Sequence, residues 1–150
     1  MLDGDKGASF KLIPAWKARV EQDDNTGIYI DIKTSESGRF EAIFVMLRSI
    51  RATLSTLQPF YTLDGIYTRL RYNLMLLIAV GIDAKDHILP LVWALVLIEN
   101  EAWWCWFCEH LVEAFESDLL PQYVIISDRD KGLLNAVELK LPGAYYTMCC

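Results

Sequence analysis

Two long apolar runs, separated by a short polar break, dominate the middle of the chain. Residues 74–82 and 88–98 are rich in Ile, Val and Leu, and residues 83–86 lie between them. Apolar runs of this length joined by a turn predict a hairpin of two buried strands. Pro90 fits near the start of the second strand, where a missing N–H is easily tolerated. Both runs are shorter than the roughly 20 residues that cross a bilayer, so we interpret them as strands of a soluble protein.

The pattern changes to a helical period after the hairpin. Asn100 can cap a helix, and Glu101 is favourable in its first turn. The apolar positions then follow at helical spacing: Trp103, Trp106, Phe107, His110, Leu111, Ala114 and Phe115. Residues 123–126 predict a short buried strand, residues 131–138 a second helix and residues 144–148 a last strand.

A short strand over residues 60–63, ending at Asp64-Gly65, precedes the hairpin. The predicted order is therefore strand, strand, strand, helix, strand, helix, strand, which indicates an α/β fold with a mixed sheet flanked by helices. Upstream, the pattern is weaker: an amphipathic piece at 11–21, a strand at 28–32, and a strand or strand-to-helix passage at 40–55. Because the composition changes near residues 57–60, we divide the chain into an N-terminal region, 1–57, and a domain, 58–150.

Charge is distributed unevenly along the 150 residues. The net charge is −6, yet residues 1–75 hold 10 Lys and Arg against 9 Asp and Glu, whereas residues 76–150 hold 4 against 11. A protein that grips DNA by itself usually carries a basic surface, so strong DNA binding is not expected from this segment alone. Cys105 and Cys108 have a C-x-x-C spacing, but they lie in an aromatic helix, and we interpret them as packing residues of an intracellular protein.

Asp64 and Asp128 are the candidates for chemistry, because each follows a short apolar strand. If the two strands are parallel neighbours, both carboxylates lie at the edge where open α/β sheets bind ligands. Two carboxylates brought together repel each other unless a cation lies between them. Mg²⁺ is suited to this place, because it binds carboxylate oxygens and substrate phosphates together.

Structural roles compete with this interpretation. Asp-Gly is a common turn pair, Asp128 can serve as a helix N-cap, and Glu99 and Glu101 suit the start of a helix. We expect His110 to pack in the core rather than act as a base. Packing is also favoured over base stacking for the tryptophans, and surface charge over phosphate binding for the arginines: Trp103, Trp104, Trp106, Arg48, Arg51, Arg69 and Arg71.

Several segments, in order, resemble the Mutator-like element (MULE) transposase domain of the ribonuclease-H-like superfamily. They are LDGIYTRL (63–70), LMLLIAVGIDAKDHILPLVWALVLIENEAWWCWF (74–107), SDRDKGLLNAV (127–137) and PGAYYTMCC (142–150), with looser likeness in AWKARVE (15–21) and GRFEAIFV (38–45). The predicted element order is that of the ribonuclease-H-like fold, although other α/β folds come close.

The resemblance implies that Asp64 and Asp128 are the first two catalytic acids of a DDE-type DNA transposase that uses Mg²⁺ or Mn²⁺. It implies transposon-end DNA as a partner and a nuclear location. The family's third acid, a glutamate farther downstream, and the histidine of its cysteine–histidine motif have no counterpart here, and Ile66 replaces a small hydroxyl residue. We therefore expect a truncated fragment that is inactive alone.

Two other functions remain open. One is a non-catalytic, transposase-derived module that binds a protein partner, which suits the acidic second half. The other is a different phosphate-binding or hydrolytic α/β domain, which ranks last because the sequence has neither a glycine-rich phosphate loop nor a nucleophile elbow.

Overall fold

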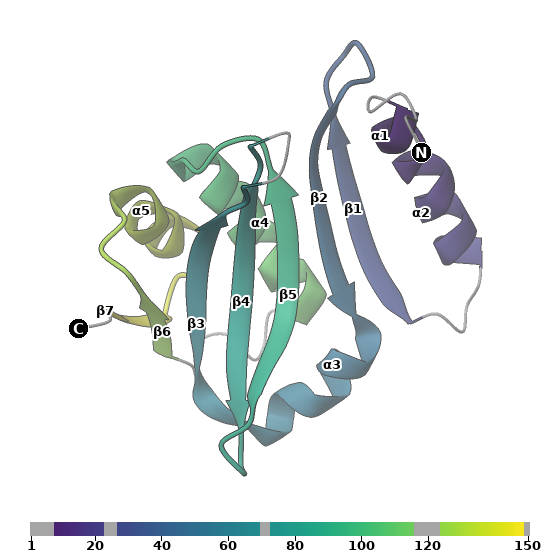
Figure 1. Cartoon of the computed structure of the whole chain (residues 1–150). Coiled ribbons are helices and arrows are strands. Elements are labelled where there is room, and N and C mark those ends of the chain that lie inside the picture. The colour runs from purple at the N-terminus through teal and green to yellow at the C-terminus, as the bar shows by residue number, and fades with distance from the viewer. Residues whose placement is uncertain (1–7, 23–26, 70–72, 116–123, 149–150) are drawn as a thin grey trace.

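One mixed sheet of seven strands organises the protein (Figure 1). The computed structural model describes residues 8–22, 27–69, 73–115 and 124–148. The strands are β1 (Ile28–Thr34), β2 (Phe40–Leu47), β3 (Leu57–Tyr67), β4 (Met75–Asp83), β5 (Ile88–Val96), β6 (Val124–Ser127) and β7 (Tyr145–Met148). The helices are α1 (Ala8–Lys11), α2 (Ile13–Gln22), α3 (Arg48–Thr53), α4 (Glu101–Phe115) and α5 (Lys131–Lys140), with a 3-10 turn, η1, at Leu54–Thr56. The predicted α/β class with a mixed sheet is confirmed.

The strands lie in the order β1-β2-β5-β4-β3-β6-β7. Neighbours are antiparallel from β1 across to β3, whereas β3, β6 and β7 are parallel. From β3 onward the elements follow the order that the sequence pattern predicts. The hairpin β4-β5 is confirmed, and its turn is closed by the carboxylate of Asp83, which accepts hydrogen bonds from the backbone N–H groups of Lys85 and His87.

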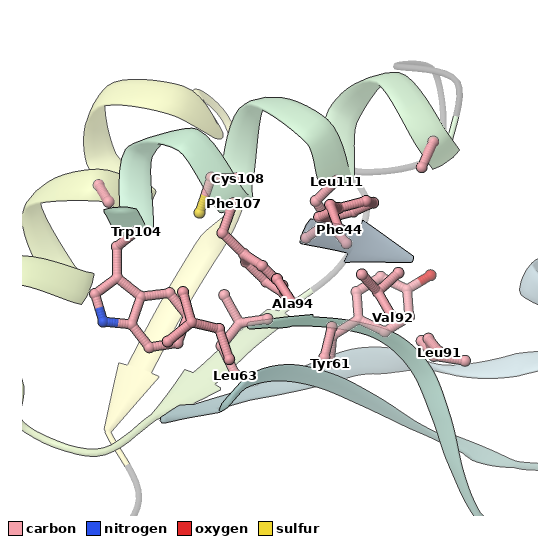
Figure 2. Packing of buried hydrophobic residues seen from close by; sticks show 14 of the residues in the cluster. Phe44, Tyr61, Leu63, Leu91, Val92, Ala94, Trp104, Phe107, Cys108 and Leu111 are labelled. Atoms are coloured by element: carbon pink, nitrogen blue, oxygen red, sulfur yellow. The ribbon is translucent and has the colours of Figure 1, made fainter. Parts of the chain in front are cut away.

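The main core lies between one face of the sheet and α4 (Figure 2). Phe44 of β2, Tyr61 and Leu63 of β3, and Trp104 and Phe107 of α4 are fully buried there. Aromatic rings make many of the contacts: Phe44 and Phe107 have ring centroids 5.5 Å apart. Burial of such large side chains is the main favourable contribution to the stability of this layer.

The opposite face of the sheet is covered only in part. Along β2, Ile43 and Val45 alternate with the core residues, and they pack with Ile13 and Val20 of α2. Over β3, β4 and β5, no described helix covers this face (Figure 1). Trp93 of β5 is accordingly 39% exposed. The predicted hairpin strands are therefore buried on one face only: along β4, buried and half-buried residues alternate.

The predicted boundary at residues 57–58 falls at the start of β3, within a continuous sheet. β2 is hydrogen-bonded to β5, and Phe44, Leu54 and Leu57 belong to the same core cluster as α4. The described part of residues 1–57 therefore shares its sheet and its core with residues 58–148.

The buried face of α4 is wider than the predicted stripe. Trp104 and Cys108 are fully buried, whereas Trp103, which the helical spacing placed in the core, is half-buried. The reason is that α4 contacts α5 as well as the sheet, so that two directions around the helix are apolar. Trp103 instead packs beside Trp106 and lies under the ammonium group of Lys33, 5.0 Å from the ring centroid.

The cysteines of α4 are free thiols that pack in the core layer. Cys108 is buried and Cys105 is half-buried. Burial raises the pKa of the Cys108 thiol to about 12, which disfavours the thiolate that metals and oxidants require. The predicted packing role is confirmed. Among the described helices, none has the length and apolar character required to span a membrane.

Candidate active site

Asp64 lies inside a strand and not at its end, so two predictions for this position were wrong. β3 continues to Tyr67, and Asp64 and Gly65 pair with Ile78 and Leu77 of β4. The Asp-Gly pair therefore forms no turn. The apolar pattern of residues 60–63 stops early because the next positions of β3 are exposed or only half-buried, although the antiparallel pairing persists.

Asp64 and Asp128 do lie on neighbouring parallel strands, as the metal hypothesis requires. β3 and β6 pair in parallel up to Thr62 and Ile126, and each aspartate follows two residues after one of these partners. Adjacent strands are about 4.8 Å apart. Thr62 and Asp64 alternate with the buried Tyr61 and Leu63, so that Asp64 faces the side of the sheet opposite α4. Both aspartates are exposed at the same end of the parallel pair.

Asp130, rather than Asp128, is the N-cap of α5. The Asp130 carboxylate accepts a hydrogen bond of 2.9 Å from the backbone N–H of Leu133. Asp128 accepts one hydrogen bond, from the backbone N–H of Asp130, through Oδ1. The N-cap interpretation of Asp128 was therefore wrong, and its carboxylate is not committed to holding the helix.

The backbone at Asp128 is fixed from β7. The hydroxyl of Tyr146 lies 3.1 Å from the carbonyl oxygen of Asp128 and 2.6 Å from the hydroxyl of Ser127. Ser127 is 1% exposed and donates to the same carbonyl oxygen. These bonds hold the chain at the point where it leaves the sheet.

Glu99 brings a third carboxylate to this edge, and the sequence patterns gave it too little weight. It lies between β5 and α4, and its Oε1 accepts a hydrogen bond of 3.2 Å from the Trp104 indole. The carboxylate lies directly against Gly65, where an added Cβ atom would be only 2.5 Å from Oε1. Glycine at position 65 therefore makes room for Glu99 on the α4 side of β3, one residue along the strand from Asp64.

Burial and neighbouring carboxylates raise the pKa of Glu99 above its usual range. Desolvation is the largest cause, and the negative charges of Asp130, Asp128 and Asp64 raise the pKa further. The hydrogen bond from Trp104 opposes these effects. Four carboxylates therefore interact electrostatically at the end of β3 and β6.

The described residues show no ion pair to this cluster. There, no Lys or Arg forms an ion pair with Asp64, Glu99 or Asp128, and no group of three or more His, Cys, Asp or Glu side chains is close enough to hold a metal ion. The described carboxylates therefore form no closed set of metal ligands. This matches the way Mg²⁺ binds in many enzymes, through one or two carboxylates with substrate phosphates as further ligands.

The other candidate residues have structural contacts. The ring of His110 packs against Phe44 and Trp106, and its Nε2 lies 2.8 Å from the Asp31 carboxylate, which confirms the packing role. Glu101 accepts a hydrogen bond from Asn135 and so links α4 to α5.

Of the tryptophans, Trp104 and Trp106 are buried, so base stacking is excluded for them. Arg48 and Arg51 lie on α3, whereas Arg69 follows β3 at the end that carries Asp64. Arg71 is outside the described residues.

Replacing Glu99 with glutamine should stabilise the protein at neutral pH. Because the folded-state pKa of Glu99 is raised above 4.5, the folded chain binds more protons than the unfolded chain just above that pH, and stability falls as pH rises through the raised value. Solvent screens the partly exposed group, so the expected gain is below about 1 kcal/mol. Melting temperatures of Glu99→Gln and wild type should diverge above pH 4.5 and converge below it. The exposed Glu138→Gln is the control, and a wild type more stable than Glu99→Gln at pH 7 contradicts the interpretation.

The fold and the site together define a mixed-sheet α/β protein with an acidic cluster at the end of two parallel strands. A family model described as the MULE transposase domain matches residues 60–150. Because this match covers more than half of the chain, the protein belongs to the MULE transposase family, and its function is transposase-derived. No curated protein matches the chain.

Proposed function

We propose that Asp64 and Asp128 are the first two catalytic acids of a DDE-type transposase with a ribonuclease-H-like fold. The observation that carries the proposal is the parallel pairing of β3 with β6, which ends two residues before each aspartate. Membership of the MULE family supports it. The element order from β3 to β7, which the ribonuclease-H-like fold shares, supports the fold assignment.

The residues present fit a divalent cation, Mg²⁺ or Mn²⁺. Asp64 and Asp128 would hold it, because both are exposed carboxylates with room for ligands. When bound, such an ion polarises a phosphodiester and activates the attacking oxygen. Glu99 acts as a neighbour that concentrates negative charge, held in place by Trp104. The acidic edge then attracts the cation that DNA phosphates need in order to approach it.

The reaction that we propose for the complete enzyme of this family is the cutting and joining of DNA strands at transposon ends, in the nucleus. Phosphoryl transfer depends mainly on positioning and electrostatic stabilisation. These 150 residues contain no counterpart of the third glutamate that the resemblance implies, so we expect the chain by itself to bind the metal weakly and to be inactive.

A second function, a module that binds a protein partner, is favoured by one feature of the fold. The uncovered face over β3, β4 and β5 exposes apolar side chains, among them Ile66 at 46% and Trp93 at 39%. Together with the acidic second half, this face suits a protein surface better than DNA. In this alternative, Asp64 and Asp128 have no role in binding.

Mn²⁺ binding measured by electron paramagnetic resonance or calorimetry tests the metal site. Asp64→Asn and Asp128→Asn should each weaken Mn²⁺ binding at least about tenfold, or ~1.4 kcal/mol, because each removes a charged ligand. Asp86→Asn is the matched control: Asp86 is an exposed carboxylate in the β4-β5 turn, with a positive φ of 64° that asparagine tolerates.

Equal Mn²⁺ affinity in the wild type and both variants would reject the proposed site. A clear metal-dependent nicking of plasmid DNA by the purified chain, lost in Asp64→Ala, would refute the expected inactivity while supporting the site. Partner capture that is unchanged in Asp64→Asn and Asp128→Asn, without Mn²⁺ binding, would favour the interaction module.

A further inference from the structure

A cavity of about 610 Å³ lies where α1 and α2 approach the hairpin of β1 and β2. Its wall includes the rings of Phe10 and Phe40, whose centroids are 4.9 Å apart at an interplanar angle of 34°. Ile32 and Leu97 add apolar surface. We call it the Phe40 cavity. Its volume lies in the range of small-ligand sites, about 300–1,000 Å³.

The charged side chains among the described lining of the Phe40 cavity are all positive. Lys11 and Arg39 belong to its lining and are exposed, whereas no Asp or Glu is among the described residues that line it. This positive charge contrasts with the net charge of −6 of the whole protein. Aromatic rings offer a stacking surface for a flat ring system, and the guanidinium and ammonium groups offer partners for an anion, best of all a phosphate. The combination selects a ligand that is planar at one end and anionic at the other.

The Phe40 cavity shares a face of the sheet with Asp64. A single row of paired residues crosses five strands on that face: Ile32, Ile43, Leu95, Leu76 and Ile66. Ile32 lines the cavity, and Ile66 is two residues from Asp64 on the same strand. Four interstrand spacings amount to about 19 Å. Leu97, which also lines the cavity, is two residues from Glu99 in the sequence.

We propose that the Phe40 cavity binds one nucleotide of a single DNA strand, with its base against Phe10 and Phe40 and its phosphate at Arg39 and Lys11. The bound nucleotide belongs to the same DNA strand as the phosphodiester that reacts at Asp64 and Asp128, and it lies a few nucleotides away from that phosphodiester. The position along the strand rests on the proposed function, whereas the base and phosphate contacts rest on the cavity itself. The cavity thereby provides a DNA-binding contact that does not require the metal.

Fluorescence anisotropy with a short labelled oligothymidylate, in EDTA, tests the proposal. The wild type should bind it about 5- to 150-fold more tightly than an abasic strand of equal length, because base stacking on aromatic rings contributes about 1–3 kcal/mol per base. Phe40→Ala should abolish this preference, and Phe40→Trp should retain it. Arg39→Gln should weaken binding of both strands and reduce the salt slope by about 0.7, the value for one phosphate contact on a single strand.

Arg39 is exposed, so Arg39→Gln remains informative even where Phe40→Ala fails to fold. Lys85→Gln, a lost positive charge in the β4-β5 turn, is the matched control and should bind like the wild type. Equal affinity for the two strands, or unchanged binding by Arg39→Gln, overturns the proposal. Because EDTA removes the metal, the oligothymidylate experiment is independent of the Mn²⁺ experiment. Absence of Mn²⁺ binding rejects the proposed function, whereas absence of oligothymidylate binding rejects only the proposal for the Phe40 cavity.

Discussion

Trp104→Ala should destabilise the protein by about 3–5 kcal/mol, the usual cost of removing a buried aromatic side chain. Trp104 is fully buried, and Figure 2 shows its indole extending from α4 toward Leu63 of β3. It packs edge-on against Phe107, with centroids 5.6 Å apart. The substitution leaves a cavity beneath the strand that carries Asp64. It also leaves the Glu99 carboxylate without its indole donor.

Urea unfolding followed by circular dichroism measures this cost. Trp103→Ala is the matched control on the same helix, because Trp103 is half-buried and its main partners are Trp106 and Lys33. Its expected cost is about 1–2 kcal/mol. If the two alanine variants lose the same stability, the assignment of Trp104 to the core is wrong.

Phe44→Ala should also cost about 3–5 kcal/mol and should lower the stability of the whole chain in one transition. Phe44 belongs to β2, upstream of the predicted boundary, yet its ring contacts Trp106, Phe107 and His110 of α4. A substitution at position 44 therefore acts on residues beyond 57. Cooperative loss of the near-ultraviolet signal of the α4 tryptophans is the expected result.

Leu47→Ala on the same strand is the control, because Leu47 is 49% exposed and its loss should cost below about 1 kcal/mol. Two separate transitions in Phe44→Ala, with only the first shifted, would show that residues 58–150 fold independently of β2.

The helices and strands from β3 onward were predictable because the hydrophobic pattern of each segment matches the element that it forms in the fold. The β4-β5 hairpin has two long apolar runs and a polar turn, and Asn100 caps α4 by accepting a hydrogen bond from the Trp103 N–H. The length of β3 was not predictable, because its last residues are exposed and held by backbone pairing with β4. Backbone pairing with a neighbouring strand leaves no hydrophobic signal where the paired residues are exposed.

The same limit applies to the site. Sequence reasoning selected Asp64 and Asp128, but it placed Asp64 at a strand end and offered Asp128, as an alternative, the capping role that Asp130 performs. Glu99 was undervalued because its contact with Gly65 joins residues 34 positions apart. The glycine after Asp64 was the available signal: a residue without a Cβ atom beside a candidate acid indicates that something lies against it.

Through the hydroxyl of Tyr146, the edge strand β7 contacts the backbone of the candidate site at Asp128. Among the described residues β7 pairs only with β6, so one of its sides is free to accept another strand. A strand that pairs there would restrain Tyr146, and the hydrogen bond from Tyr146 to the Asp128 carbonyl would then restrain the backbone of Asp128. A strand added at β7 would thus act on the acidic cluster from two strands away from Asp64.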